Sequence, residues 1–237
     1  MTDTLAKPGL EGVVAAETRL SSVDGQAGEL IIGGFPLEEL AAKATFEETL
    51  YLLWHDTLPD ADSLAVFQQA LRAHRSLPPP TLKLLRDAAR ANIAAMDALR
   101  MAAASLSLNA PDQNPAGEPQ RDALLAVAGV PTVVAAFWRL RNGQEPLAPR
   151  NGLGRAANYR DMLVGETPTP AQVRGLETYL NTVVDHGLNA STFAARVIIA
   201  TQSDMISAVV GALGALKGPL HGGAPGPALD MVFAIAE

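Results

Sequence analysis

Hydrophobic side chains recur every three or four residues over most of the chain, which is the period of an α-helix packed on one face. Thr45 and Glu48 have the spacing of a capping box at the start of one such segment, and Thr169 followed by Pro170 opens another. Asp204 begins a third. We expect further helices at 63–75, 81–90, 94–107, 119–141 and 190–201. The pattern predicts a mainly α-helical chain.

The N-terminal part follows a different pattern. Residues 13–32 alternate weakly between apolar and polar positions around Asp24 and Gly25, which is typical of a β-hairpin turn. Clusters of Gly, Pro and Asn at 109–118 and 142–154 predict surface loops within one domain. We therefore expect a single multi-helix domain over residues 1–237, with a short β-hairpin at its N-terminus.

Composition narrows the class of protein. Aromatic residues make up only 5%, which favours packed helices over a sheet, and the net charge of −7 argues against nucleic acid or an anionic membrane as a partner. Without cysteine the chain has no thiol nucleophile and no Cys-ligated metal, and no two histidines have metal-binding helical spacing. We find no leader segment and no uncharged apolar run of about 18 residues. These features predict a soluble cytoplasmic protein without a metal.

Four histidines are the main candidates for chemistry. His55 and His74 lie among charged neighbours on predicted helices, so we interpret them as solvated or capping side chains. His186 and His221 lie in more specific surroundings and are considered separately.

His186 follows the long helix that starts at Pro170, and Gly187 is a natural helix stop. We expect His186 at the helix C-terminus, where the helix dipole favours an imidazolium. With the amide of Asn189 and the hydroxyls of Ser191 and Thr192 nearby, it could anchor an anionic, oxygen-rich ligand. The alternative is a histidine that only caps its own helix.

His221 lies in a segment rich in glycine and proline between two apolar stretches. Gly222 and Gly223 would let the backbone approach a ligand closely. A histidine just before a helix N-terminus is pushed towards its neutral form, which can donate a hydrogen bond to a carbonyl oxygen and steady an enol. The alternative is an ordinary loop with a buried polar residue.

At these two segments the chain resembles the citrate synthase family. The resemblance rests on residues 9–18 (GLEGVVAAET) with 23–25 and 34–41, on residues 185–192 (DHGLNAST), and on residues 211–224 (GALGALKGPLHGGA). Members of this family join oxaloacetate to acetyl-CoA in a Claisen-type condensation and hydrolyse the resulting thioester. The resemblance thus implies an acyltransferase of the tricarboxylic acid cycle.

Carried over by motif, the resemblance implies that His186 binds the keto-acid with Asn189 in the same pocket. It implies that His221 is the catalytic neutral histidine that hydrogen-bonds the thioester carbonyl and stabilises its enol. It also implies an all-helical homodimer that binds oxaloacetate and acyl-CoA, with acetyl-CoA as co-substrate and no cofactor. The apolar helix at 203–217 is then a candidate for the dimer interface.

The family also uses a further catalytic histidine, an aspartate that removes the methyl proton and several arginines, and the matched motifs do not include them. We therefore expect an incomplete large domain, lacking most of the small domain and inactive alone. Three alternatives stay open: a non-catalytic helical dimerisation or interaction module, a keto-acid sensor, and a 2-methylcitrate synthase that uses propionyl-CoA. One methylene changes specificity by only about 1–3 kcal/mol, so the sequence does not choose the acyl group.

Overall fold

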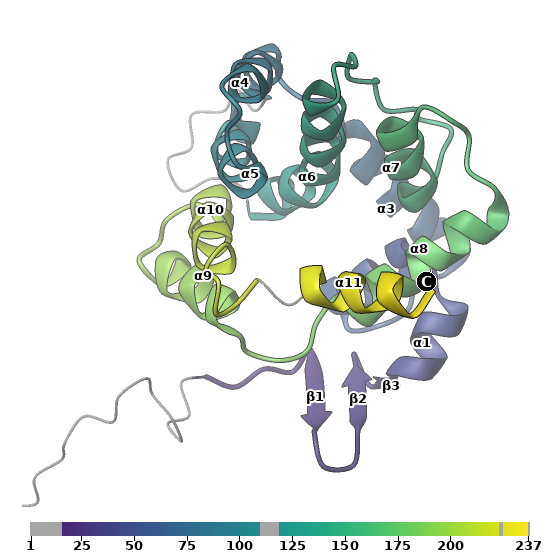
Figure 1. Ribbon diagram of the computed structural model, residues 1–237. Helices are drawn as coiled ribbons and strands as arrows, with labels where there is room; N and C mark the ends of the chain where they lie inside the picture. Colours follow the sequence, from purple (N-terminus) through teal and green to yellow (C-terminus); the bar gives the residue numbers. More distant parts are fainter. Residues whose placement is uncertain (1–15, 110–118, 223–224, 237) are drawn as a thin grey trace, which may run out of the picture.

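The computed structural model describes residues 16–109, 119–222 and 225–236, and it confirms the mainly helical architecture (Figure 1). The helices are α1 (Leu37–Lys43), α2 (Phe46–His55), α3 (Ala61–Ala73), α4 (Pro79–Arg90), α5 (Ala95–Ala104), the 3-10 helix η2 (Leu106–Asn109), α6 (Pro119–Arg141), α7 (Arg155–Val164), α8 (Pro170–Thr182), α9 (Ala190–Ala200), α10 (Met205–Leu216) and α11 (Pro225–Ala236). Both predicted capping boxes are present, at Thr45 and at Thr169.

The predicted hairpin is confirmed over residues 21–32. Residues 16–20 were expected in it but are not strand, and 13–15 lie outside the described residues. Strand β1 (Ser21–Asp24) pairs antiparallel with β2 (Glu29–Ile32), which pairs with the short β3 (Phe35–Pro36). Ile32 is fully buried against α1 and α2, where it packs with Leu40 and Leu52. This contact anchors the small sheet to the helical domain.

Helix α6 is the centre of the core (Figure 1). Its Val133 packs with α4 and α5, its Ala128 packs with α2 and α3, and its Leu125 packs against Ile206 of α10. By length and mean hydropathy α6 would also fit across a bilayer, which the search for an uncharged run did not predict. Half of its apolar window is buried inside the molecule, as in the core helix of a globular protein.

Helix α7 was not predicted, because two of its four buried side chains are polar and interrupt the apolar pattern. Asn158 and Asp161 are buried, and both hold the preceding loop: the main-chain N–H of Arg150 donates to Asn158 Oδ1 at 2.7 Å, and Arg150 Nε lies 3.1 Å from Asp161 Oδ2. Gly154 supplies no side-chain cap at the start of the helix. Contacts with the predicted loop at 142–154 therefore fix a helix that hydrophobic periodicity does not reveal.

An ionic cluster lies beneath this loop. The buried Arg75 donates to the carbonyl oxygen of Leu153 at 2.8 Å, and the buried Glu47 accepts a hydrogen bond from the main-chain N–H of Arg155 at 2.7 Å. The Arg155 guanidinium stacks over the Phe46 ring at 5.4 Å. Burial lowers the pKa of Arg155 to about 10, while the charge of Glu47 acts in the opposite direction. The cluster joins α2, α7 and the turn that follows α3.

Helices α9 and α10 form an antiparallel pair beside α5 and α6 (Figure 1). Asp204 caps α10 as predicted, since its carboxylate accepts the Ser207 N–H at 2.8 Å. The pair is closely packed: a Cβ on Gly211 of α10 would lie 2.1 Å from Cδ1 of Ile198. The open end of this helix pair carries the candidate site.

Candidate active site

The two histidine motifs meet at the open end of the α9–α10 pair. His221, in the turn after α10, places its Nε2 atom 2.9 Å from the Ser191 hydroxyl and 3.3 Å from the Ser191 main-chain nitrogen. Ser191 lies in the first turn of α9, thirty residues earlier in the chain. Of the ring nitrogens, Nε2 thus faces α9, and Nδ1 has no hydrogen-bond partner among the described residues.

Glycine fixes the turn that carries His221. The main-chain N–H groups of His221 and Gly222 both donate to the carbonyl oxygen of Gly218, at 3.0 and 3.2 Å. A Cβ on Gly222 would lie 2.1 Å from the carbonyl oxygen of Leu216, the last residue of α10. The lack of a side chain at Gly222 therefore lets this turn pack against the end of α10, a role that the sequence did not suggest.

Asn189 is the N-cap of α9. Its Oδ1 atom accepts hydrogen bonds from the Thr192 main-chain N–H at 2.9 Å and from the Ser191 hydroxyl at 2.8 Å. Its Nδ2 atom has no partner within the described ranges. The structure therefore brings Asn189 and His221 together through Ser191, while the amide Nδ2 of Asn189 stays available for hydrogen bonding.

The expected position of His186 was wrong. Helix α8 ends at Thr182 rather than running to Gly187, so His186 lies in an exposed loop beyond the helix C-terminus. Val184 leaves the helical path because it packs into the core clusters around Phe46 and Ile32. The dipole argument for an imidazolium at His186 accordingly fails, although His186 remains in the loop that leads into α9.

Asp185 fixes this loop, and sequence reasoning gave it no such role. Its Oδ1 atom accepts the Gly187 N–H at 3.1 Å, which makes a tight turn around His186, and it also accepts the hydroxyl hydrogen of Ser21 in β1. Gly187 has φ 93°, a left-handed conformation that glycine adopts readily. An aspartate two residues before a glycine is a local turn signal, whereas Ser21 lies 164 residues away and had no signal.

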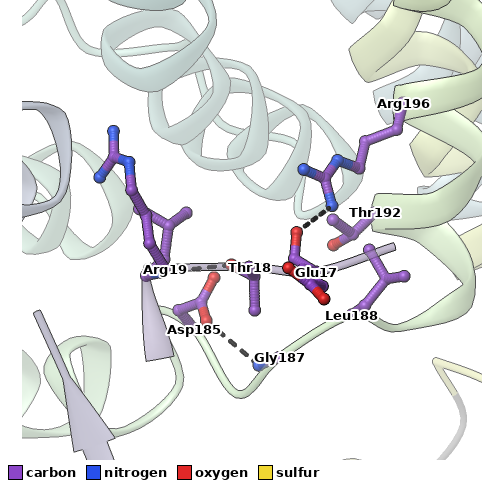
Figure 2. Close-up of a pocket in the computed structure, with 9 residues that line it drawn as sticks. Glu17, Thr18, Arg19, Asp185, Gly187, Leu188, Thr192 and Arg196 are labelled. Carbon is purple, nitrogen blue, oxygen red and sulfur yellow. Dashed lines mark hydrogen bonds between the residues drawn. The ribbon is translucent and has the colours of Figure 1, made fainter. Parts of the chain in front are cut away.

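A pocket of about 530 Å³ borders this loop (Figure 2). Its lining comes from residues 17–20, from Asp185, Gly187 and Leu188, and from Thr192 and Arg196 of α9. Arg196 closes one side by donating to the carbonyl oxygen of Glu17 at 3.2 Å. His186, Asn189 and His221 do not line this pocket, so the predicted site lies next to it.

The other two histidines have the local roles expected of them. His74 is the C-cap of α3 and places Nδ1 2.8 Å from the carbonyl oxygen of Ala70. His55 is the last residue of α2, exposed, with its ring 4.2 Å from that of Tyr51.

Comparisons with known proteins identify the family of this chain. The family model described as "Citrate synthase, C-terminal domain" matches residues 9–237. The chain is 44% identical to the 2-methylcitrate synthase of Mycobacterium tuberculosis over 92% of its own length and 55% of the relative's. It is 41% identical to the citrate synthase of Haloferax volcanii, over 95% of this chain and 61% of that one.

Solved structures give the same result. The citrate synthase of Pyrobaculum aerophilum superposes with a TM-score of 0.86 at 36% identity, over 98% of this chain and 62% of that one. The citrate synthase of Thermoplasma acidophilum, in a ternary complex with carboxymethyl coenzyme A and oxaloacetate, gives 0.82 at 28% identity over 91% and 57%. The chain thus spans somewhat more than half the length of these relatives. On the family match and the shared fold, this chain belongs to the citrate synthase family.

Proposed function

We propose that this chain takes part in the condensation of oxaloacetate with an acyl-CoA thioester. It supplies the groups that bind the keto-acid and the group that stabilises the enol. The hydrogen bond of 2.9 Å between His221 and Ser191 is the observation that best supports this role. It ties the turn after α10 to the first turn of α9, and the loop that carries His186 leads into this helix. The ligands named for the Thermoplasma acidophilum complex, oxaloacetate and a coenzyme A analogue, fit this substrate class.

Each side chain then has a distinct task. His221, held at Nε2, offers Nδ1 to the thioester carbonyl and stabilises the enol as the methyl proton leaves. His186, exposed on the loop fixed by Asp185, binds the keto-acid. The free amide Nδ2 of Asn189 donates to a carboxylate oxygen of the same ligand.

A second candidate function is the same condensation with a different acyl group on coenzyme A. The relative with 44% identity is named a 2-methylcitrate synthase, and the one with 41% identity a citrate synthase. Propionyl-CoA would replace acetyl-CoA in the first case. The difference is one methylene, so both thioesters belong in the same assay.

We further propose that the 237-residue chain has no turnover by itself. The motifs shared with the family do not include its second histidine, its catalytic aspartate or its carboxylate-binding arginines. A positioned acid or base contributes about 10²–10⁴ in rate, so losing two leaves negligible activity.

A thiol-release assay with oxaloacetate and either acyl-CoA tests both statements. We expect no turnover from the 237-residue chain, and turnover from a chimaera that continues it with the C-terminal part of the Haloferax volcanii enzyme. A chimaera with His221→Ala is the matched control and should lose the activity. Turnover by the 237-residue chain would refute its inactivity. Absence of oxaloacetate binding to that chain in calorimetry would contradict the keto-acid role.

Self-association is the last part of the proposal. Helix α11 exposes several large apolar side chains, namely Leu229, Met231, Val232, Phe233 and Ile235. Helix α10 packs against α9, α5 and α6 through its buried Ile206 and Ala208, and its other residues stay partly or fully exposed. We expect a homodimer in light scattering that involves α11 together with the 203–217 segment. A monomer at all concentrations would contradict it.

A further inference from the structure

His186 is exposed and makes no hydrogen bond with the described residues, so the main chain of its loop determines where its ring lies. That loop, residues 185–188, lies between two fixed points. Val184 packs into the hydrophobic core before it, and Asn189 is the N-cap of α9 after it. Every hydrogen bond between residues 185–188 and the described part of the chain involves the carboxylate of Asp185. The conformation of the loop therefore depends on this one side chain.

One oxygen of Asp185 joins the loop to the small sheet. Its Oδ1 atom accepts the Gly187 main-chain N–H at 3.1 Å, which closes a turn around His186 (Figure 2), and also accepts the hydroxyl hydrogen of Ser21 in β1. The first bond is local, and a turn held only by a side chain of its own exposed loop opens readily. The second bond fixes the Asp185 side chain from outside the loop. The turn therefore depends on where Ser21 lies.

Ser21 is held in place by the sheet and by the core beneath it. It pairs with Ile32 of β2, which is fully buried, and the carbonyl oxygen of the preceding Leu20 accepts the Gly33 N–H at 2.8 Å. Its side chain is half-buried, whereas that of its neighbour Ser22 lies on the opposite face of the strand and is exposed. Ser21 thus offers the loop a hydrogen-bond donor whose position the core determines.

The chain that enters β1 is held at a second point. Arg196 of α9 donates to the carbonyl oxygen of Glu17 at 3.2 Å (Figure 2). Residues 17–20 line the same pocket as Asp185, so this contact lies beside the loop. It limits movement of the segment before β1, and hence of Ser21, relative to the start of α9.

We propose that Ser21 is a positioning residue for His186: its hydroxyl acts through Asp185 and holds the turn that presents the imidazole to the keto-acid. This inference rests on the proposed role of His186 in oxaloacetate binding. A binding group that is in place for only a fraction of the time lowers the apparent affinity by that fraction. If the turn forms about a third of the time without Ser21, the apparent Kd for oxaloacetate rises about 3-fold.

Calorimetric titration of oxaloacetate into the 237-residue chain and its variants tests this role. Ser21→Ala should weaken binding by about 3- to 10-fold, because the turn loses the hydrogen bond that anchors it. Ser21→Thr keeps the hydroxyl and should stay within about 2-fold of wild type. Ser22→Ala is the matched control, since Ser22 lies on the same strand and makes no hydrogen bond with the described residues. It should leave the affinity unchanged.

Two further measurements separate positioning from a general loss of stability. In a His186→Ala background the positioned group is absent, so adding Ser21→Ala should change the remaining affinity by less than about 2-fold. Exchange of the Gly187 amide hydrogen with solvent, followed by NMR without ligand, reports on the turn itself. It should become at least about 3-fold faster in Ser21→Ala and stay unchanged in Ser22→Ala.

Unchanged affinity in Ser21→Ala would overturn the proposal, even if exchange at Gly187 were faster. Equal losses in Ser21→Ala and Ser22→Ala would also overturn it. So would an undiminished loss in the His186→Ala background, because Ser21 would then act on the fold and not on His186. If the wild-type chain binds no oxaloacetate, the proposed function of His186 fails. The Gly187 exchange rates then decide whether Ser21 fixes the turn, and equal rates in Ser21→Ala and wild type would refute that as well.

Discussion

Arg155 donates a hydrogen bond to the carbonyl oxygen of Val127, the acceptor that Pro131 leaves without a helical donor inside α6. Proline has no N–H, so the carbonyl four residues earlier needs another partner. Here the partner is a guanidinium whose charge is offset by Glu47. The interruption of the central helix and the ionic cluster beneath α7 are therefore one feature.

This relationship predicts coupling between the two positions. Arg155→Met should destabilise the fold by about 3 kcal/mol, because it leaves the Val127 carbonyl and the Glu47 carboxylate uncompensated. In a Pro131→Ala background the helix regains its own donor, and the loss should shrink by about 1 kcal/mol. Urea unfolding of the four chains measures this double-mutant cycle. Strictly additive losses would contradict the proposed pairing.

A second prediction concerns Gly222. A methyl group there meets the Leu216 carbonyl, which is backbone and cannot move aside, so Gly222→Ala should cost about 1–3 kcal/mol and displace His221 from Ser191. Gly226→Ala is the control, because a Cβ at Gly226 would have nothing within 4 Å. Thermal unfolding and the His221 NMR signals provide the measurement. Equal effects of the two substitutions would rule out the steric explanation.

The cap of α10 predicts a dependence on pH. Hydrogen bonds from Ser207 hold the pKa of Asp204 below its ordinary value. Since the carboxylate is favoured in the folded state, its contribution is present above the unfolded pKa of about 3.9 and is lost as the pH falls through the folded value. The deficit of Asp204→Asn against wild type should therefore shrink between about pH 5 and pH 2. A constant deficit in denaturant melts over this range would refute the assignment.

Substitutions of His186 and His221 should have different effects on the binding of oxaloacetate. His186→Ala should weaken oxaloacetate binding by about 10-fold or more, the value of one hydrogen bond to a charged group. His221→Ala should change it by less than about 3-fold, because His221 acts on the thioester. Isothermal titration calorimetry provides the measurement, with His74→Ala as a control. The roles would be reversed if His221→Ala showed the larger loss.

Local signals in the sequence predicted the helices whose N-terminal caps are formed by residues close together in the chain. The boxes at Thr45 and Thr169 and the cap at Asp204 depend on residues three positions apart, so sequence alone reveals them. The end of α8 was misjudged because packing of Val184 into two core clusters decides it. Likewise, α7 forms on polar contacts with Arg150 that have no periodicity.

The residues of the candidate site could be predicted from the sequence, but the hydrogen bonds between them could not. Motif resemblance singled out His186, Asn189 and His221, and the structure brings Asn189 and His221 together. The link is Ser191, which acts across two helices, so its role depends on a distance that no sequence spacing encodes.

The lengths of the two antiparallel helices α9 and α10 set the distance between Ser191 and His221. Helix α9 has 11 residues and α10 has 12, and Ser191 and His221 both lie at the end of the pair away from the connecting turn. One extra turn in a single helix would shift its end by about 5.4 Å, well beyond hydrogen-bond reach. Insertions at the closed end, around 201–204, would leave this distance unchanged. During divergence, the lengths of the two helices can therefore change only together, while the turn between them can vary in length as long as the cap residue Asp204 is kept.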